Sequence, residues 1–163
     1  MASALPDQAQ AHSGIRVRWC SLRLARQPQL AGIKHLNRLE NVLARQEWSD
    51  PDIAEGLLCD DTGAVIGGTR SNVFAMRAGR LLTPELSSSG IAGVTRDRVL
   101  RAAIRHDIEI QVARLEPANI VNADEVFLSN SIVGLLPVAE LDNRLWRTTN
   151  WTAQFQQWID ETD

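Results

Sequence analysis

A single lysine is the residue in this sequence best suited to covalent chemistry. Lys34 is the only lysine among the 17 lysine and arginine residues of the 163-residue chain. An amine can lose its proton and form an imine with an aldehyde, which a guanidinium cannot do. A general preference for arginine would produce the same count, so the count alone leaves both interpretations open.

The neighbours of Lys34 favour a reactive amine. Lys34 follows Ile33 and precedes Leu36, in a loop after which a helix is predicted. We expect these apolar side chains to shield the amine partly from water, which disfavours the charged form and makes the amine nucleophilic. The common alternative is a surface lysine whose stem lies on the protein while its charge reaches the solvent.

Two further segments have the residue types of an anion site. Residues 90–96 read GIAGVTR and lead directly into a predicted helix. The first amides of a helix have no partner within it and lie at its positive end, and glycine lets the backbone approach a ligand closely. Ser129-Asn130-Ser131 follows a predicted strand and could add hydroxyl groups. Taken singly, the first segment could be a helix cap at Thr95 and the second a polar turn.

The elements that position these residues form a mixed α/β pattern. Alternating apolar and polar residues predict strands, and apolar residues at helical spacing predict helices. The predicted strands cover residues 14–20, 55–59, 64–66, 72–77, 80–83, 108–115, 125–129 and 136–141. The predicted helices cover residues 36–48, 95–106 and 151–159, and Ala78-Gly79 predicts a tight hairpin. This order favours a mixed α/β or α+β fold over a strict βαβ repeat.

Composition narrows the class of protein. With 44% hydrophobic residues, 23% charged residues and a net charge of −3, the chain suits one globular domain over residues 14–163 after a flexible leader over residues 1–13. It has no basic stripe and no apolar run of membrane-spanning length, so we expect neither a nucleic-acid nor a membrane partner. Cys20 and Cys59 lie in strand-like stretches, which predicts buried thiols and a cytoplasmic protein. No metal site is expected, because no ligands stand at a suitable spacing.

Three segments together resemble the class IV aminotransferases, the fold-type-IV pyridoxal-phosphate enzymes. They are residues 30–48 (LAGIKHLNRLENVLARQEW), 67–96 (GGTRSNVFAMRAGRLLTPELSSSGIAGVTR) and 125–138 (EVFLSNSIVGLLPV). The run Gly-Ile-Lys-His-Leu-Asn-Arg is more similar to aminodeoxychorismate lyases than to branched-chain or D-amino-acid aminotransferases. The resemblance implies the C-terminal large domain of this fold and a homodimer. It also implies a lyase that eliminates pyruvate from aminodeoxychorismate to give 4-aminobenzoate for folate synthesis.

The resemblance also implies a role for five residues toward pyridoxal 5'-phosphate. Lys34 matches the lysine that binds the cofactor aldehyde, and Ile91 matches the aliphatic residue under the pyridine ring. Val94 and Thr95 match the pair whose backbone amides hold the phosphate, and Ser131 matches a hydroxyl residue that adds a phosphate contact.

Two departures from the family pattern bear on activity. Family members have a glutamate where this chain has Gly67, and that carboxylate stabilises the pyridine nitrogen on which the cofactor's electron withdrawal depends. They also carry a small N-terminal domain before the segment that starts near Gly14, so the resemblance implies a chain without that domain. An aminotransferase and a non-catalytic remnant therefore stay open beside the lyase.

Overall fold

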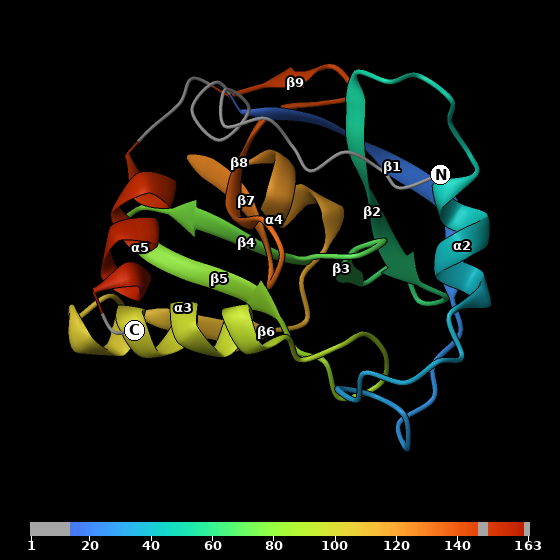
Figure 1. Cartoon of the computed structure of the whole chain (residues 1–163), viewed down its shortest axis with the longest axis horizontal. Helices are drawn as coiled ribbons and strands as arrows, with labels where there is room; N and C mark the ends of the chain where they lie inside the picture. Colours follow the sequence, from blue (N-terminus) through green and yellow to red (C-terminus); the bar gives the residue numbers. More distant parts are fainter. Residues whose placement is uncertain (1–13, 147–149, 162–163) are drawn as a thin grey trace.

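The chain is built around one curled sheet (Figure 1). The computed structural model describes residues 14–146 and 150–161, so the leader predicted over residues 1–13 lies outside the described residues. The sheet has nine strands in the order β3-β2-β1-β8-β7-β4-β5-β6, with β9 paired to β8. Their bounds are β1 Ile15–Leu24, β2 Ile53–Asp60, β3 Val65–Gly68, β4 Asn72–Arg77, β5 Arg80–Pro84, β6 Ile110–Ala113, β7 Glu125–Asn130, β8 Gly134–Leu141 and β9 Arg144–Leu145.

The two ends of this strand order approach each other. β1 is parallel to both β2 and β8, and β5 is parallel to β6, whereas the remaining pairs are antiparallel. The Val65 N–H of β3 donates to the Leu115 carbonyl just after β6, at 2.8 Å. The sheet therefore curls into a half-barrel, and the mixed α/β fold predicted from the sequence is confirmed.

Both faces of the sheet are buried, which the side chains of β4 illustrate. Val73 and Ala75 belong to the cluster inside the curl, while Phe74 and Met76 point the other way into a second cluster. The helices α3 (Val94–Arg105) and α5 (Trp151–Asp160) cover that second face (Figure 1). Because side chains alternate along a strand, neighbouring residues of β4 belong to the two different core clusters.

The helix predicted over residues 36–48 is shorter than expected. The helix α2 spans only Leu39–Arg45, because the chain makes a tight turn in which the Arg38 N–H donates to the Leu36 carbonyl at 2.8 Å. The apolar residues that predicted an internal face, Leu36, Leu39, Val42 and Leu43, are exposed in this structure. Their helical spacing describes an outward apolar surface rather than a core contact.

Smaller differences separate the predicted from the observed elements. The strand predicted over residues 108–115 is the shorter β6, and the five-residue α4 (Pro117–Val121) and the strand β9 were not predicted. The hairpin at Ala78-Gly79 is confirmed: both residues have positive φ, 49° and 77°, as a two-residue turn between twisted strands requires.

Candidate active site

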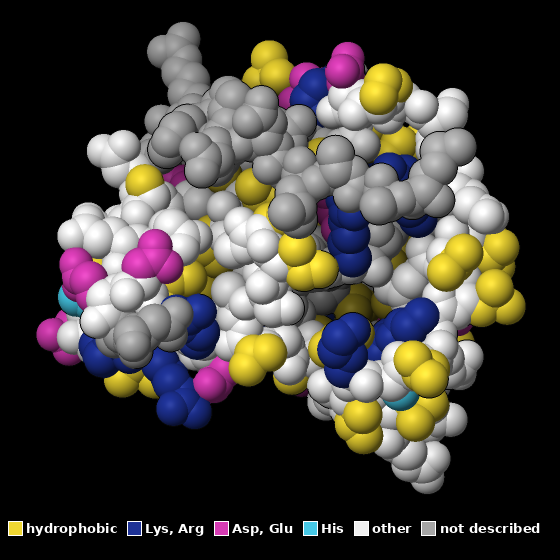
Figure 2. Space-filling view, in the orientation of Figure 1, with side chains coloured by type: hydrophobic (Ala, Val, Ile, Leu, Met, Phe, Trp, Pro, Cys, Tyr) yellow, Lys and Arg dark blue, Asp and Glu magenta, His cyan; other side chains and the backbone are white. Residues whose placement is uncertain are grey.

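All five candidate residues line one cavity of about 330 Å³. Lys34 comes from the loop before α2, Ile91 from the loop after β5, Val94 and Thr95 from the start of α3, and Ser131 from the turn after β7. Figure 2 shows a hollow beside β3 with basic side chains gathered at its rim. Segments that are far apart in the sequence therefore meet in one place.

A short backbone bridge ties the Lys34 loop to the segment that holds Ile91. The Gly32 N–H donates to the Gly90 carbonyl and the Ala92 N–H donates to the Gly32 carbonyl, both at 3.0 Å. This parallel pairing fixes the lysine loop against the loop that leads into α3. It explains why Lys34 and Ile91 line the same cavity.

Asn72 holds the start of α3 in place. The helix begins at Val94 with Gly93 as its N-cap, rather than at Thr95 as predicted. The Asn72 amide donates to the Ile91 carbonyl at 2.7 Å, and the Gly93 N–H donates to Asn72 Oδ1 at 3.2 Å. A side chain on Gly93 would collide with Asn72 Oδ1, so glycine permits this close approach. The free amides at the start of a 12-residue helix consequently border the cavity.

The charges around the cavity favour an anion. Lys34, Arg38 and Arg70 line it, of which Arg70 forms an ion pair with Glu55 at 3.8 Å, and no Asp or Glu lines it in the part of the chain that the structure describes. Ser129, only 2% exposed, also lines it, and its Oγ has no hydrogen-bond partner among the described residues. An unpaired buried hydroxyl costs about 1–3 kcal/mol, which a phosphate oxygen would relieve. The site therefore fits a phosphate-bearing cofactor.

Glu55 shapes one wall of the cavity and was not predicted. This carboxylate, 4% exposed in β2, accepts hydrogen bonds from the Thr69 N–H at 3.1 Å, the Ser71 hydroxyl at 3.0 Å and the Arg70 N–H at 3.3 Å. It thus organises the turn between β3 and β4, whose residues border the cavity. A single acid within the otherwise apolar run of residues 53–59 was the available signal.

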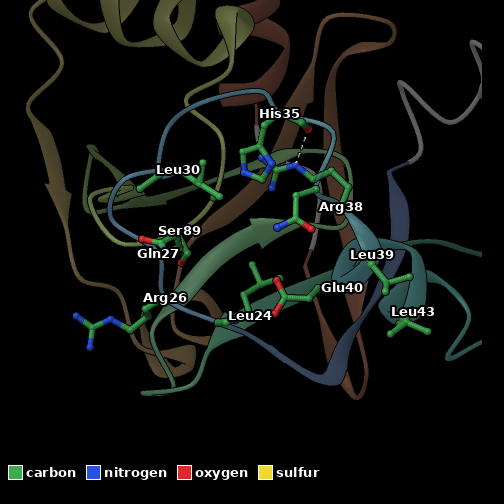
Figure 3. A pocket seen from close by; sticks show the side chains of 14 residues that line it. Leu24, Arg26, Gln27, Leu30, His35, Arg38, Leu39, Glu40, Leu43 and Ser89 are labelled. Atoms are coloured by element: carbon green, nitrogen blue, oxygen red, sulfur yellow. Dashed lines mark hydrogen bonds between the residues drawn. The ribbon is translucent and has the colours of Figure 1, made fainter.

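Arg38 braces the Lys34 loop and was also not predicted. Its Nη2 donates to the Ile33 carbonyl at 2.9 Å. Its Nε donates to the His35 carbonyl at 3.4 Å (Figure 3). These carbonyls belong to the residues on either side of Lys34. Burial lowers the pKa of the Arg38 guanidinium from its ordinary value, and the charge of Glu40 acts in the opposite direction.

The expected shielding of Lys34 by its neighbours is wrong for this chain. Ile33 is 54% exposed, Leu36 is fully exposed, and Lys34 itself is exposed. The loop turns these side chains outward, because Arg38 holds the loop by its backbone carbonyls rather than by apolar packing. Apolar neighbours in sequence therefore did not translate into burial.

Gly67 lies where the cavity would otherwise receive a side chain. It lines the cavity at β3, and a Cβ built on it would lie 2.8 Å from the Ser71 carbonyl oxygen. A carboxylate side chain at this position would therefore require the turn after β3 to shift. Nothing acidic takes its place among the described residues that line the cavity.

Two other kinds of feature do not occur in the described ranges, 14–146 and 150–161. No helix within them is long and apolar enough to cross a membrane. Nor do they contain a group of three or more His, Cys, Asp or Glu side chains placed to hold a metal ion.

Comparisons with known proteins agree with this geometry. The family model "Amino-transferase class IV" matches residues 1–141. The chain is 37% identical to an aminodeoxychorismate lyase from Vibrio harveyi over 77% of its own length and 46% of that protein. Its fold matches the 4-amino-4-deoxychorismate lyase from Pseudomonas aeruginosa (TM-score 0.92, 40% identity, 96% of this chain and 58% of that one). It also matches the T.th. branched-chain amino acid aminotransferase with pyridoxamine 5'-phosphate (TM-score 0.84, 28% identity, 98% and 54%).

The chain spans about half the length of the relatives it matches, and the fold it shares with them is that of the fold-type-IV enzymes. The match of the family model over most of the sequence and the identity to the lyase lead to the same conclusion. This chain belongs to the class IV aminotransferase family.

Proposed function

We propose that this chain carries the lysine-bearing part of a pyridoxal-phosphate-dependent 4-amino-4-deoxychorismate lyase. Such an enzyme eliminates pyruvate from its substrate and leaves 4-aminobenzoate for folate synthesis. The observation that carries the proposal is the cavity lined by Lys34, the start of α3 and Ser131. Because the chain covers only about half of each relative, the activity of the whole enzyme is part of the proposal.

Each lining residue has a defined task in this proposal. The amide groups of Val94 and Thr95 and the hydroxyl of Ser131 hold the cofactor phosphate, and Ile91 packs against the cofactor ring. When bound, pyridoxal phosphate withdraws electrons from the carbon that bears the substrate amine. The Lys34 Nζ would hold the cofactor aldehyde until the substrate amine takes its place, and the freed lysine amine would then accept a proton from the substrate carbon and return one as the product forms.

The choice of lyase over aminotransferase rests on the sequence around Lys34 and on the degree of identity. The lyases from Vibrio harveyi and Pseudomonas aeruginosa are 37% and 40% identical to this chain, against 28% for the aminotransferase structure. The alternative is a D-amino-acid or branched-chain aminotransferase, which is supported by the 35% identity to a putative branched-chain aminotransferase from Methanocaldococcus jannaschii over 69% of the chain.

A third candidate is a chain that folds without turning substrate over. Gly67 supports it, because no carboxylate borders the cavity in the described residues to stabilise a pyridine nitrogen.

The resemblance further implies a homodimer, for which the apolar residues exposed along α2 offer a surface. Two buried free thiols, Cys20 and Cys59, support a cytoplasmic location.

Product analysis separates the three candidates. Purified chain with pyridoxal phosphate and aminodeoxychorismate should release pyruvate and 4-aminobenzoate in equal amounts, and Lys34→Ala should release neither. Amino transfer from D-alanine or leucine to an oxo acid, without 4-aminobenzoate, would replace the lyase by an aminotransferase. Neither reaction at high protein concentration, with the cofactor bound, would favour the non-catalytic chain.

A further inference from the structure

A second cavity of about 470 Å³ lies beside the first. Leu24, Arg38 and Gly90 line both cavities, so the two adjoin at these residues. Figure 3 shows the second cavity from close by; the aliphatic residues that line it include Leu30, the buried Leu24, and the largely exposed Leu39 and Leu43 at its edge. The lining thus combines aliphatic side chains with polar and charged ones, which suits a ring that carries polar substituents.

Two buried polar atoms in this cavity lack a partner. His35 Nδ1 and Ser89 Oγ are both inaccessible to solvent and form no hydrogen bond among the described residues, and both residues line the cavity. Ser89 as a whole is 7% exposed. Leaving such atoms unsatisfied is unfavourable, so their gathering in one cavity indicates a ligand that carries polar substituents.

The charges of the cavity identify the kind of substituent. Arg26 forms an ion pair with Asp60 at 4.0 Å, and Glu40 accepts a hydrogen bond from the Ala25 N–H at 2.9 Å. Arg38 is bound only to two neutral carbonyls. Within the described residues it forms no ion pair, and its Nη1 has no hydrogen-bond partner. Arg38 therefore presents a guanidinium without an ion pair where the two cavities meet, with Glu40 as the carboxylate whose charge acts on it.

We infer that Arg38 recognises a ring carboxylate of the substrate and that the ring lies in the second cavity. The inference rests on the proposed function, in which Lys34 acts on the amine-bearing carbon from the first cavity. A guanidinium binds a carboxylate through strong, charge-assisted hydrogen bonds, and the leucine side chains pack against the ring. The site thereby selects a cyclic amino acid with a carboxylate over an aliphatic one.

Binding of benzoate tests this assignment without turnover. In NMR titrations of the purified chain, benzoate should bind at least about tenfold more tightly than benzamide, which has the same shape and no charge. Equal affinities of the two compounds for the unaltered chain would overturn the inference.

Variants locate the recognition. Arg38→Met should abolish the preference for benzoate, whereas Arg70→Met, at an arginine that lines only the first cavity, should keep it. Leu30→Trp should fill the second cavity and weaken benzoate binding about tenfold or more. In Leu30→Trp, at a residue that lines only the second cavity, borohydride should still trap pyridoxal phosphate on Lys34.

The contrary results are equally defined. A preference for benzoate that survives in Arg38→Met, or benzoate binding unchanged in Leu30→Trp, would overturn the inference. A loss of cofactor trapping together with benzoate binding in Arg38→Met would also overturn it, because the residue would then only brace the Lys34 loop. Since no product is measured, failure of the lyase reaction would leave this test intact.

Discussion

The buried carboxylate of Glu55 gives a prediction with a definite magnitude. In Glu55→Gln the amide nitrogen replaces one oxygen, and every neighbour of both oxygens is a donor: Gly56, Thr69, Arg70 and Ser71. The least costly arrangement turns the nitrogen toward Ser71, whose hydroxyl can rotate, and leaves the Arg70 N–H unpaired. One unpaired donor plus the loss of charge from the other bonds amounts to about 2–4 kcal/mol.

The assay is urea unfolding followed by tryptophan fluorescence. The Trp48 indole donates to the Ile53 carbonyl at the start of β2, so it reports on the strand that carries Glu55. The matched control is Glu109→Gln, at an exposed glutamate 2.9 Å from Arg80, which should cost less than about 0.5 kcal/mol. A loss of stability in Glu55→Gln no larger than in this control would refute the reasoning.

Three further predictions concern other parts of the fold. Gly93→Ala should displace Asn72 and weaken pyridoxal-phosphate binding about tenfold or more, measured by absorbance; unchanged affinity would contradict the close approach at the start of α3. Burial acts to raise the pKa of Asp60, but hydrogen bonds from the following turn bring it below its ordinary value. The charged Asp60 therefore stabilises the fold above its unfolded pKa of about 3.9, and this stabilisation is lost as the pH falls through the folded pKa. In Asp60→Asn the free energy of unfolding in urea should fall less steeply below pH 4 than in the unaltered chain; the same pH dependence in both would refute this. Burial raises the pKa of the Cys20 thiol to about 12 and also raises that of Cys59, so neither should react with a disulfide reagent at pH 8 until the chain unfolds; rapid reaction of the folded chain would contradict it.

The sequence predicted β4 well because a short apolar run bounded by turn residues is typical of a strand that is buried on both faces. β4, predicted over residues 72–77, has the same bounds in the structure. For the helix predicted over residues 36–48, the apolar pattern did not predict the burial of the side chains. Apolar spacing marks a face that avoids water, but it does not say whether this chain covers that face, and Leu39 and Val42 are exposed.

The five candidate residues that line the site could be predicted from the sequence, but the hydrogen bonds that hold them in place could not. The glycine-rich run before α3 is compatible with an anion site or with a plain helix cap, and only the resemblance assigns it to phosphate together with Lys34 and Ser131. The partners of Glu55 and Arg38 could not be predicted, because most of them are backbone groups, which every residue has. The bridge between Gly32 and Ile91 is likewise a backbone contact between distant segments.

The most direct test of the account is reductive trapping of the cofactor. Purified chain is incubated with pyridoxal phosphate, reduced with borohydride, digested and mapped by mass spectrometry. With a single lysine in the sequence, the label can fall only on Lys34 or on the α-amine of the chain. The account predicts label concentrated on Lys34 and lost in Lys34→Ala. Label that is absent, or that falls only on the α-amine, would mean that the cavity around Lys34 does not hold the cofactor.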